Sequence, residues 1–129
     1  MNDPVNHEPL SPASIAAQAL RRLRLRRTRD IPVFRQLNSL ECGATCLAMV
    51  LAYHGRHVRS EQLAKQLGVT RDGATANAII DVARTHGLVT RAVRVDLDAL
   101  PHLTSGAILH WDFNHFVVFE RAWRDAVQI

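Results

Sequence analysis

The chain has 129 residues, of which 47% are hydrophobic and 22% charged, and its formal net charge at pH 7 is +4. This length suits one globular domain with a single core, and the composition excludes fibrous and disordered proteins. The longest apolar run, residues 42–53, is too short for the ~20 residues of a membrane-spanning helix. Two cysteines four positions apart exclude a disulfide framework, so we expect a reducing, cytosolic compartment.

The positive charge is concentrated in an N-terminal arm, residues 1–30. Its segment 21–29, RRLRLRRTR, carries six arginines and no acid, which leaves about −2 (+4 − 6) for the rest of the chain. Residues 1–12 are expected to be flexible, whereas the spacing of apolar residues over 14–27 predicts a basic helix. The arginines could bind an anionic membrane surface or a partner protein, and a solvated segment is an equal alternative. No nucleic-acid-binding motif accompanies them, so we expect no nucleic-acid partner.

Residues 31–129 are expected to form the compact domain, and its first half is helical. Apolar residues recurring at three and four positions predict helices over residues 42–54, 60–67 and 76–86. Gly55, Gly68 and Gly87 are placed to end these helices. Ser60 is expected to be the N-cap of the second helix.

After Gly87 the spacing of apolar residues changes from helical to alternating, which is typical of strands. We expect a half-exposed strand over 88–95, a short helix or turn over 96–103, a buried strand over 106–111, and strands over 115–120 and 126–129. Turns are expected at 112–114 and near Trp123. Helices followed by an antiparallel sheet indicate the α+β class.

Cys42 lies at the predicted start of the most apolar helix. Unpaired backbone N–H groups and the helix dipole favour a thiolate at that position, and a thiolate is nucleophilic near neutral pH. Gly43 would let another backbone or a substrate approach closely. Cys46 lies one turn deeper on the apolar face, and we expect it to be a small core residue.

A cysteine nucleophile needs a base, usually a histidine, to take and return its proton. Seven histidines are present, and two of them, His110 and His115, flank the connection between two predicted strands. We single out His115 because it begins a buried strand beside a tight turn, although a structural histidine is an alternative there. Gln36, six residues before Cys42, could donate its amide to an oxyanion alongside the Cys42 N–H, or it could be a solvated loop residue.

The stretch QLNSLECGATCLAMVLAYHG, residues 36–55, resembles the cysteine motif of the double-glycine leader peptidases. These are papain-like N-terminal domains of bacteriocin-processing ABC transporters. The stretch AILHWDFNHFVVFE, residues 107–120, is similar to the family's histidine motif, and the resemblance covers residues 31–129. It implies N-terminal helices packed on a C-terminal antiparallel sheet, with Cys42 as nucleophile, His115 as general base and acid, and Gln36 as oxyanion donor. It implies neither a cofactor nor a metal ion.

The resemblance also implies a function. The chain would be a cysteine endopeptidase that removes the leader from a precursor peptide, cutting after a small pair such as Gly-Gly or Gly-Ala, before export by an ABC transporter. Its partners would be a precursor with a helical leader and the transmembrane and ATP-binding parts of the same full-length chain. We therefore expect it in the cytoplasm, at the inner face of the cell membrane.

Two alternatives remain open. One is a domain of the same fold that binds leaders without cutting them, which we rank lower because Cys42, His115 and Gln36 are all retained. The other is a metal or redox site built from the two cysteines and the histidines near residues 54–57. It is disfavoured because His54 would lie about 18 Å along the helix from Cys42, too far for a shared ion.

One departure from the family pattern concerns the third catalytic residue, an Asp in an Asp-Pro pair on the strand after the histidine strand. No such pair occurs here. If strands 115–120 and 126–129 pair across a turn near Trp123, the position opposite His115 falls one to three residues past Ile129. Asp125 would lie at the turn, and nothing requires Asp112 to reach the site. We therefore expect a domain truncated before its orienting Asp, with slower catalysis and intact leader binding.

Overall fold

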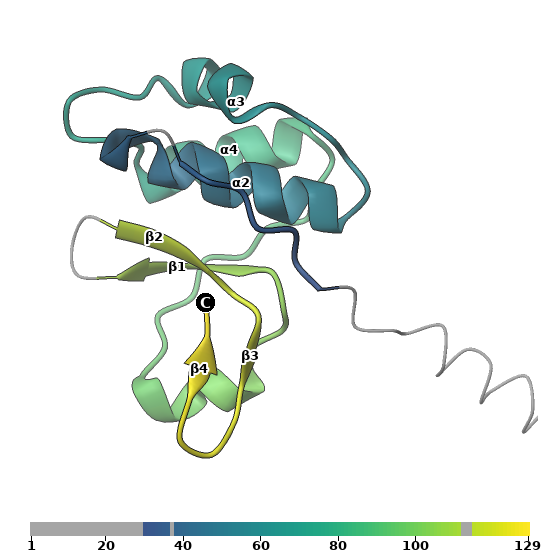
Figure 1. Cartoon of the computed structure of the whole chain (residues 1–129). Coiled ribbons are helices and arrows are strands. Elements are labelled where there is room, and N and C mark those ends of the chain that lie inside the picture. Colours follow the sequence, from purple (N-terminus) through teal and green to yellow (C-terminus); the bar gives the residue numbers. More distant parts are fainter. Residues whose placement is uncertain (1–29, 37, 112–114) are drawn as a thin grey trace, which may run out of the picture.

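The structure, a computed structural model, describes residues 30–36, 38–111 and 115–129. The expected basic helix over 14–27 and the connection 112–114 lie outside the described residues. Helices α2 (Cys42–Tyr53), α3 (Ser60–Leu67) and α4 (Ala76–Thr85) gather in one layer, and a β-hairpin passes beneath α2 (Figure 1). This order of elements confirms the α+β class.

The ends of the three helices follow local sequence signals. Gly55, Gly68 and Gly87 all have positive φ angles just after the helices that they end, as predicted. The predicted N-cap of α3 is wrong by one position. Arg59 holds the cap with extended backbone and no side-chain cap bond, and Ser60 is the first helical residue.

Helix α2 forms the centre of the core. Its residues from 42 to 48, with Val50 and Leu51, are all buried, because a helix that is apolar on every side is stable only inside a protein. The other elements pack their apolar residues against it, namely Leu63 and Leu67 of α3, Ile79, Val82 and Ala83 of α4, and Phe116 and Val118 of the hairpin. The predicted cysteine helix is therefore confirmed, and it is the element around which the domain is organised.

Shortening a core side chain of α2 should destabilise the whole domain. Leu51 is 0% exposed, so we expect Leu51→Ala to lower the free energy of unfolding by about 2–5 kcal/mol. Chemical denaturation measures this change. The matched control is Leu97→Ala, because Leu97 is 70% exposed and its truncation should cost at most about 0.5 kcal/mol. Equal losses in the two variants would contradict the position of the core.

Two antiparallel hairpins follow the helices. Strand β1 (Ala107–Trp111) pairs with β2 (His115–Phe119), and Trp111 lies directly opposite His115. Strand β3 (Arg121–Ala122) pairs with β4 (Val127–Gln128). The predicted hairpin of 106–111 with 115–120 is confirmed, although β1 is only partly buried. The predicted pairing of 115–120 with 126–129 is wrong, because the chain folds back over 123–126 and β4 pairs with Arg121–Ala122, which was expected to belong to the turn.

The expected strand over 88–95 is wrong. Residues 88–96 belong to no strand, and the segment is largely exposed, with Val89 102% exposed. Its apolar residues do alternate, but a strand needs a hydrogen-bonding neighbour as well as a pattern, and the described residues supply none. The short helix expected next is confirmed as η2 (Leu97–His102), a 3-10 helix.

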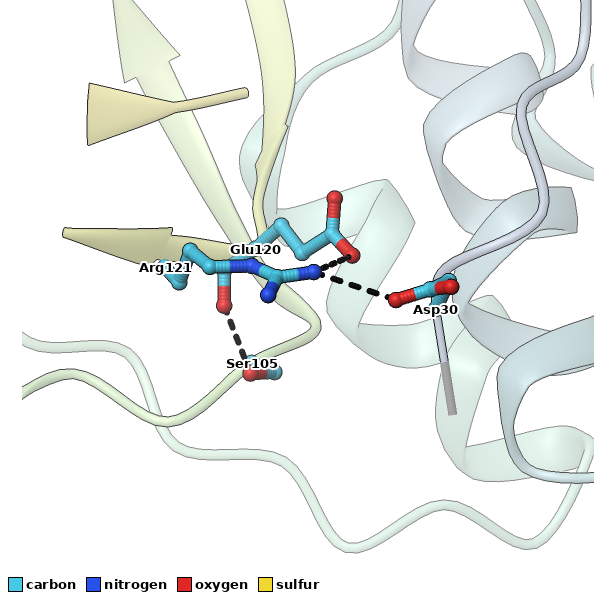
Figure 2. Close-up of polar contacts among 4 residues, drawn as sticks. All are labelled: Asp30, Ser105, Glu120 and Arg121. Atoms are coloured by element: carbon cyan, nitrogen blue, oxygen red, sulfur yellow. Dashed lines mark hydrogen bonds and ion pairs between the residues drawn. The ribbon is translucent and has the colours of Figure 1, made fainter. Parts of the chain in front are cut away.

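Ion pairs join the start of the domain to its last hairpin. Arg121 Nη2 donates to Asp30 Oδ1 and to Glu120 Oε1, both at 3.0 Å (Figure 2). Ser105 Oγ donates to the backbone oxygen of Glu120 at 2.6 Å. The bond to Glu120 and the two acidic charges raise the pKa of Arg121. Since Asp30 and Arg121 are exposed, the pair adds little stability, but it fixes the chain just before the buried Ile31.

Candidate functional site

Cys42 is the first residue of α2 and is 3% exposed. A 3-10 turn, η1 (Ser39–Glu41), leads the chain into the helix. Asn38 holds this turn, because its Oδ1 accepts from Leu40 N–H at 3.0 Å and its Nδ2 donates to Glu41 Oε1 at 3.1 Å. The thiol therefore lies at the positive end of the α2 dipole, where the sequence predicted it.

Cys42 and His115 line the same small cavity, which has a volume of about 110 Å³. Three segments form its walls: η1 with the start of α2, residues 72–74 before α4, and the start of β2. The fold therefore brings the predicted nucleophile and the predicted base to one cavity, although a long stretch of chain separates them.

Gly43, the second residue of α2, has close neighbours on three other segments. A Cβ atom at this position would lie 3.1 Å from Ala74 Cβ, 3.1 Å from Ile79 Cδ1 and 3.4 Å from Phe116 Cδ2. We expected Gly43 to admit a backbone or a substrate, but the groups that approach it are side chains of the protein itself. The glycine lets α2 pack closely against both the entry to α4 and strand β2.

The two histidines of the hairpin have different surroundings. His115 is exposed at the start of β2 and lines the cavity. His110 lies on β1, where its ring stacks on Phe116 with the ring centroids 4.7 Å apart and the planes inclined by 21°. Of these two histidines, His115 is the one that shares a cavity with Cys42, and its role as the base stays a prediction.

Cys46 is the core residue that the sequence predicted. It is 6% exposed, and its Sγ donates to the backbone oxygen of Phe116 at 3.2 Å. Burial, with a smaller effect of Cys42, raises the pKa of the Cys46 thiol from 9.0 to about 12. As the pH rises, the unfolded chain therefore loses this proton first. The contribution of Cys46 to stability is complete below about pH 9 and declines as the pH approaches 12.

Gln36 does not line the cavity. It is an exposed residue of the segment before η1, and no hydrogen bond of its side chain occurs within the described residues. Asp125 lies in the turn between β3 and β4, as expected, and Asp112 lies outside the described residues.

Asp72 is a cavity residue that the sequence analysis missed. It lines the cavity beside Cys42 and His115. Its turn is held by mutual backbone bonds between Thr70 and Gly73 and by the Asp72 N–H donating to Thr70 Oγ1 at 3.3 Å. The letters TRDGAT predict such a turn, but nothing in them says that it forms a wall of the site.

The described residues do not support the alternative of a metal site. Within residues 30–36, 38–111 and 115–129, no group of three or more His, Cys, Asp or Glu residues is arranged to hold an ion. Both cysteines are free thiols. In the same ranges, no helix is both long and apolar enough to cross a bilayer.

Comparison with known proteins places these residues in a family context. The model of the Peptidase C39 family matches residues 30–129. The chain is 40% identical over 101 residues to the colicin V secretion/processing ATP-binding protein CvaB of Escherichia coli, covering 78% of this chain and 14% of that protein. It is 35% identical over 77 residues to the transport/processing ATP-binding protein ComA of Streptococcus pneumoniae, covering 58% and 11%. The chain therefore spans a small part of the length of these relatives.

Two solved structures share the fold. One is a double-glycine motif protease from an AMS/PCAT transporter in complex with the leader peptide, with a TM-score of 0.72 and 39% identity over 78% of this chain and 72% of that chain. The other is the peptidase domain of Streptococcus ComA, with a TM-score of 0.64 and 22% identity over 75% of each chain. At 22% identity, the second likeness shows the fold alone.

Proposed function

Because the chain belongs to the peptidase C39 family of cysteine peptidases, we propose that it removes the double-glycine-type leader from a precursor peptide before ABC-transporter export. The observation that carries this proposal is the cavity shared by Cys42 and His115. The relatives named as secretion and processing proteins support it, as does the related transporter protease with a bound leader peptide.

The proposed reaction uses Cys42 and His115 as a pair. His115 takes the proton of the Cys42 thiol, and the thiolate attacks the scissile carbonyl to form a tetrahedral oxyanion. His115 then gives the proton to the leaving amine, which leaves a thioester on Cys42. Water, deprotonated by His115, hydrolyses this thioester and releases the leader.

The oxyanion needs hydrogen-bond donors close to Cys42. The backbone N–H of Cys42, at the start of α2, is the proposed main-chain donor, and Gln36 stays the predicted side-chain donor. Since Gln36 lies outside the cavity, this role requires the segment before η1 to bring its amide inward when substrate binds. Loops at active sites often make such movements.

The cavity also supports a preference for small residues before the scissile bond. Its volume is about 110 Å³, and two of its walls are Gly73 and Ala74. Gly43 lets neighbouring side chains close in on the same space. We propose that a Gly-Gly or Gly-Ala pair fits there, whereas a branched side chain does not.

The partners and location follow from the same relatives. We propose that residues 31–129 are the peptidase domain of a longer chain with transmembrane and ATP-binding parts. It would act in the cytoplasm at the inner face of the cell membrane on precursors with helical leaders. The arm, residues 1–30, is proposed to bind the anionic membrane surface through Arg21–Arg29, a contact favoured by its six arginines.

Mass spectrometry of a synthetic precursor tests the function. We expect a peptide with an amphipathic helical leader ending in Gly-Gly to be cut once, after the second glycine. Replacing that glycine by leucine should slow cleavage by roughly 10–200-fold, because the narrow cavity rejects the added side chain. Replacing it by alanine is the control and should change the rate little. Binding of the leader with no change in mass would instead support the non-cleaving domain.

A further inference from the structure

Cys46 is a buried thiol that the proposed reaction does not use. It lies one helical turn from Cys42, and its Sγ donates to the backbone oxygen of Phe116 at 3.2 Å. Phe116 directly follows His115 in β2. The bond therefore joins the helix that carries the nucleophile to the strand that carries the base, at positions close to both.

Two further contacts hold the same point of β2. The ring of Phe116 stacks on His110 of β1, with 4.7 Å between the centroids. Its Cδ2 also lies close against α2, where a Cβ atom on Gly43 would come within 3.4 Å. Packing thus fixes the Phe116 side chain, while the Cys46 bond is the one that fixes its backbone oxygen to α2.

We propose that Cys46 is a positioning residue, whose thiol holds β2 at the Phe116 carbonyl and so sets where the His115 imidazole lies relative to the Cys42 sulfur. The inference rests on the proposed function, because it presumes that Cys42 and His115 act as a pair. Cys46 touches neither the substrate nor the reacting atoms and acts through His115.

The chemistry of Cys46 suits this role. Its burial raises the pKa of the thiol to about 12, so the group remains a hydrogen-bond donor at neutral pH. A thiol is a weak donor, and we therefore expect a few-fold effect on the pair and not a collapse of the fold.

The test measures how fast iodoacetamide alkylates Cys42 between about pH 5 and pH 10, with the site of modification located by mass spectrometry. Cys46→Ala and Cys46→Val remove the donor, and Cys46→Ser keeps one. At about pH 6.5 we expect the Ala and Val variants to react roughly two- to fivefold more slowly than the parent, and the Ser variant to stay within about twofold. At about pH 10 all four should react alike, because hydroxide in the solvent can then take the thiol proton in place of His115.

Coincident pH profiles in the parent and all three variants would overturn the inference, even if the variants melt at lower temperature. A Ser variant that follows Ala and Val would also overturn it. If Cys46→Ala does not fold, the comparison of Cys46→Val with Cys46→Ser tests the inference in its place. A His115→Ala variant distinguishes failure of this inference from failure of the proposed Cys42–His115 pair. If it alters the parent profile while the Cys46 series does not, only this inference fails. If it alters nothing, the proposed pair fails.

Discussion

We expect Cys42→Ala to abolish the proposed leader cleavage, with a loss of about 10⁴–10⁶ in kcat. The reason is that Cys42 carries the one thiol that lines the cavity among the described residues. Cys46 cannot replace it, because it is buried outside the cavity and its thiol stays protonated. The variant should still fold, because alanine suits a buried position at the start of a helix. Mass spectrometry of the synthetic precursor measures the loss, and circular dichroism checks the fold.

Cys46→Ala is the matched control for this experiment. It makes the same substitution one turn further along α2, where the side chain is equally buried. We expect it to retain cleavage to within about tenfold. Alkylation of Cys42 by iodoacetamide should inactivate the parent. Full activity in Cys42→Ala would show that the cysteine of the cavity is not the nucleophile.

His115→Ala is expected to lower kcat/KM by about 10⁴ or more. Without the imidazole, Cys42 has no base to activate it near neutral pH, and the leaving amine has no acid to protonate it. The loss should shrink at high pH, where hydroxide can take the thiol proton in place of the imidazole, although the leaving amine still lacks its proton donor. The measurement is the pH profile of kcat/KM on the same precursor.

Two further variants give smaller expected losses with which the loss in His115→Ala can be compared. His110→Ala removes the other histidine of the hairpin, which stacks on Phe116 and does not line the cavity. We expect it to cost less than about tenfold in kcat/KM. Gln36→Ala should fall between the two, at about 10²–10³ in kcat, if its amide reaches the oxyanion. A larger loss in His110→Ala than in His115→Ala would show that His115 is not the base.

The parts of the fold that the sequence predicted are those fixed by local physics. Helix α2 is one long apolar run, α3 and α4 each have one periodic apolar face, and a glycine follows each of the three, so their positions could be predicted from the sequence. The hairpin that starts β2 at His115 was also recognisable, because two alternating runs flank a short connection. Cys42 at the helix start and His115 at the strand start follow from these elements alone.

The parts that the sequence could not predict depend on contacts between distant segments. Alternation in residues 88–95 describes two faces of a chain but does not supply the neighbour that a strand requires. Asp72 lines the cavity because its turn lies beside η1 and β2, and the turn letters carry no such information. The N-cap of α3 could not be predicted to the residue either, because the helix begins one position earlier than the capping preference of Ser60 indicates.

The exposed segment 88–96 has a consequence for how the protein behaves in concentrated solution. Val89, Val93 and Val95 stand on alternate positions and face the solvent, while β1 has only β2 as a neighbour within the described residues. Extended apolar chain beside an open strand edge is a template for pairing between molecules. We therefore expect self-association through this face to limit the colloidal stability of the protein, whatever repulsion its net charge of +4 provides.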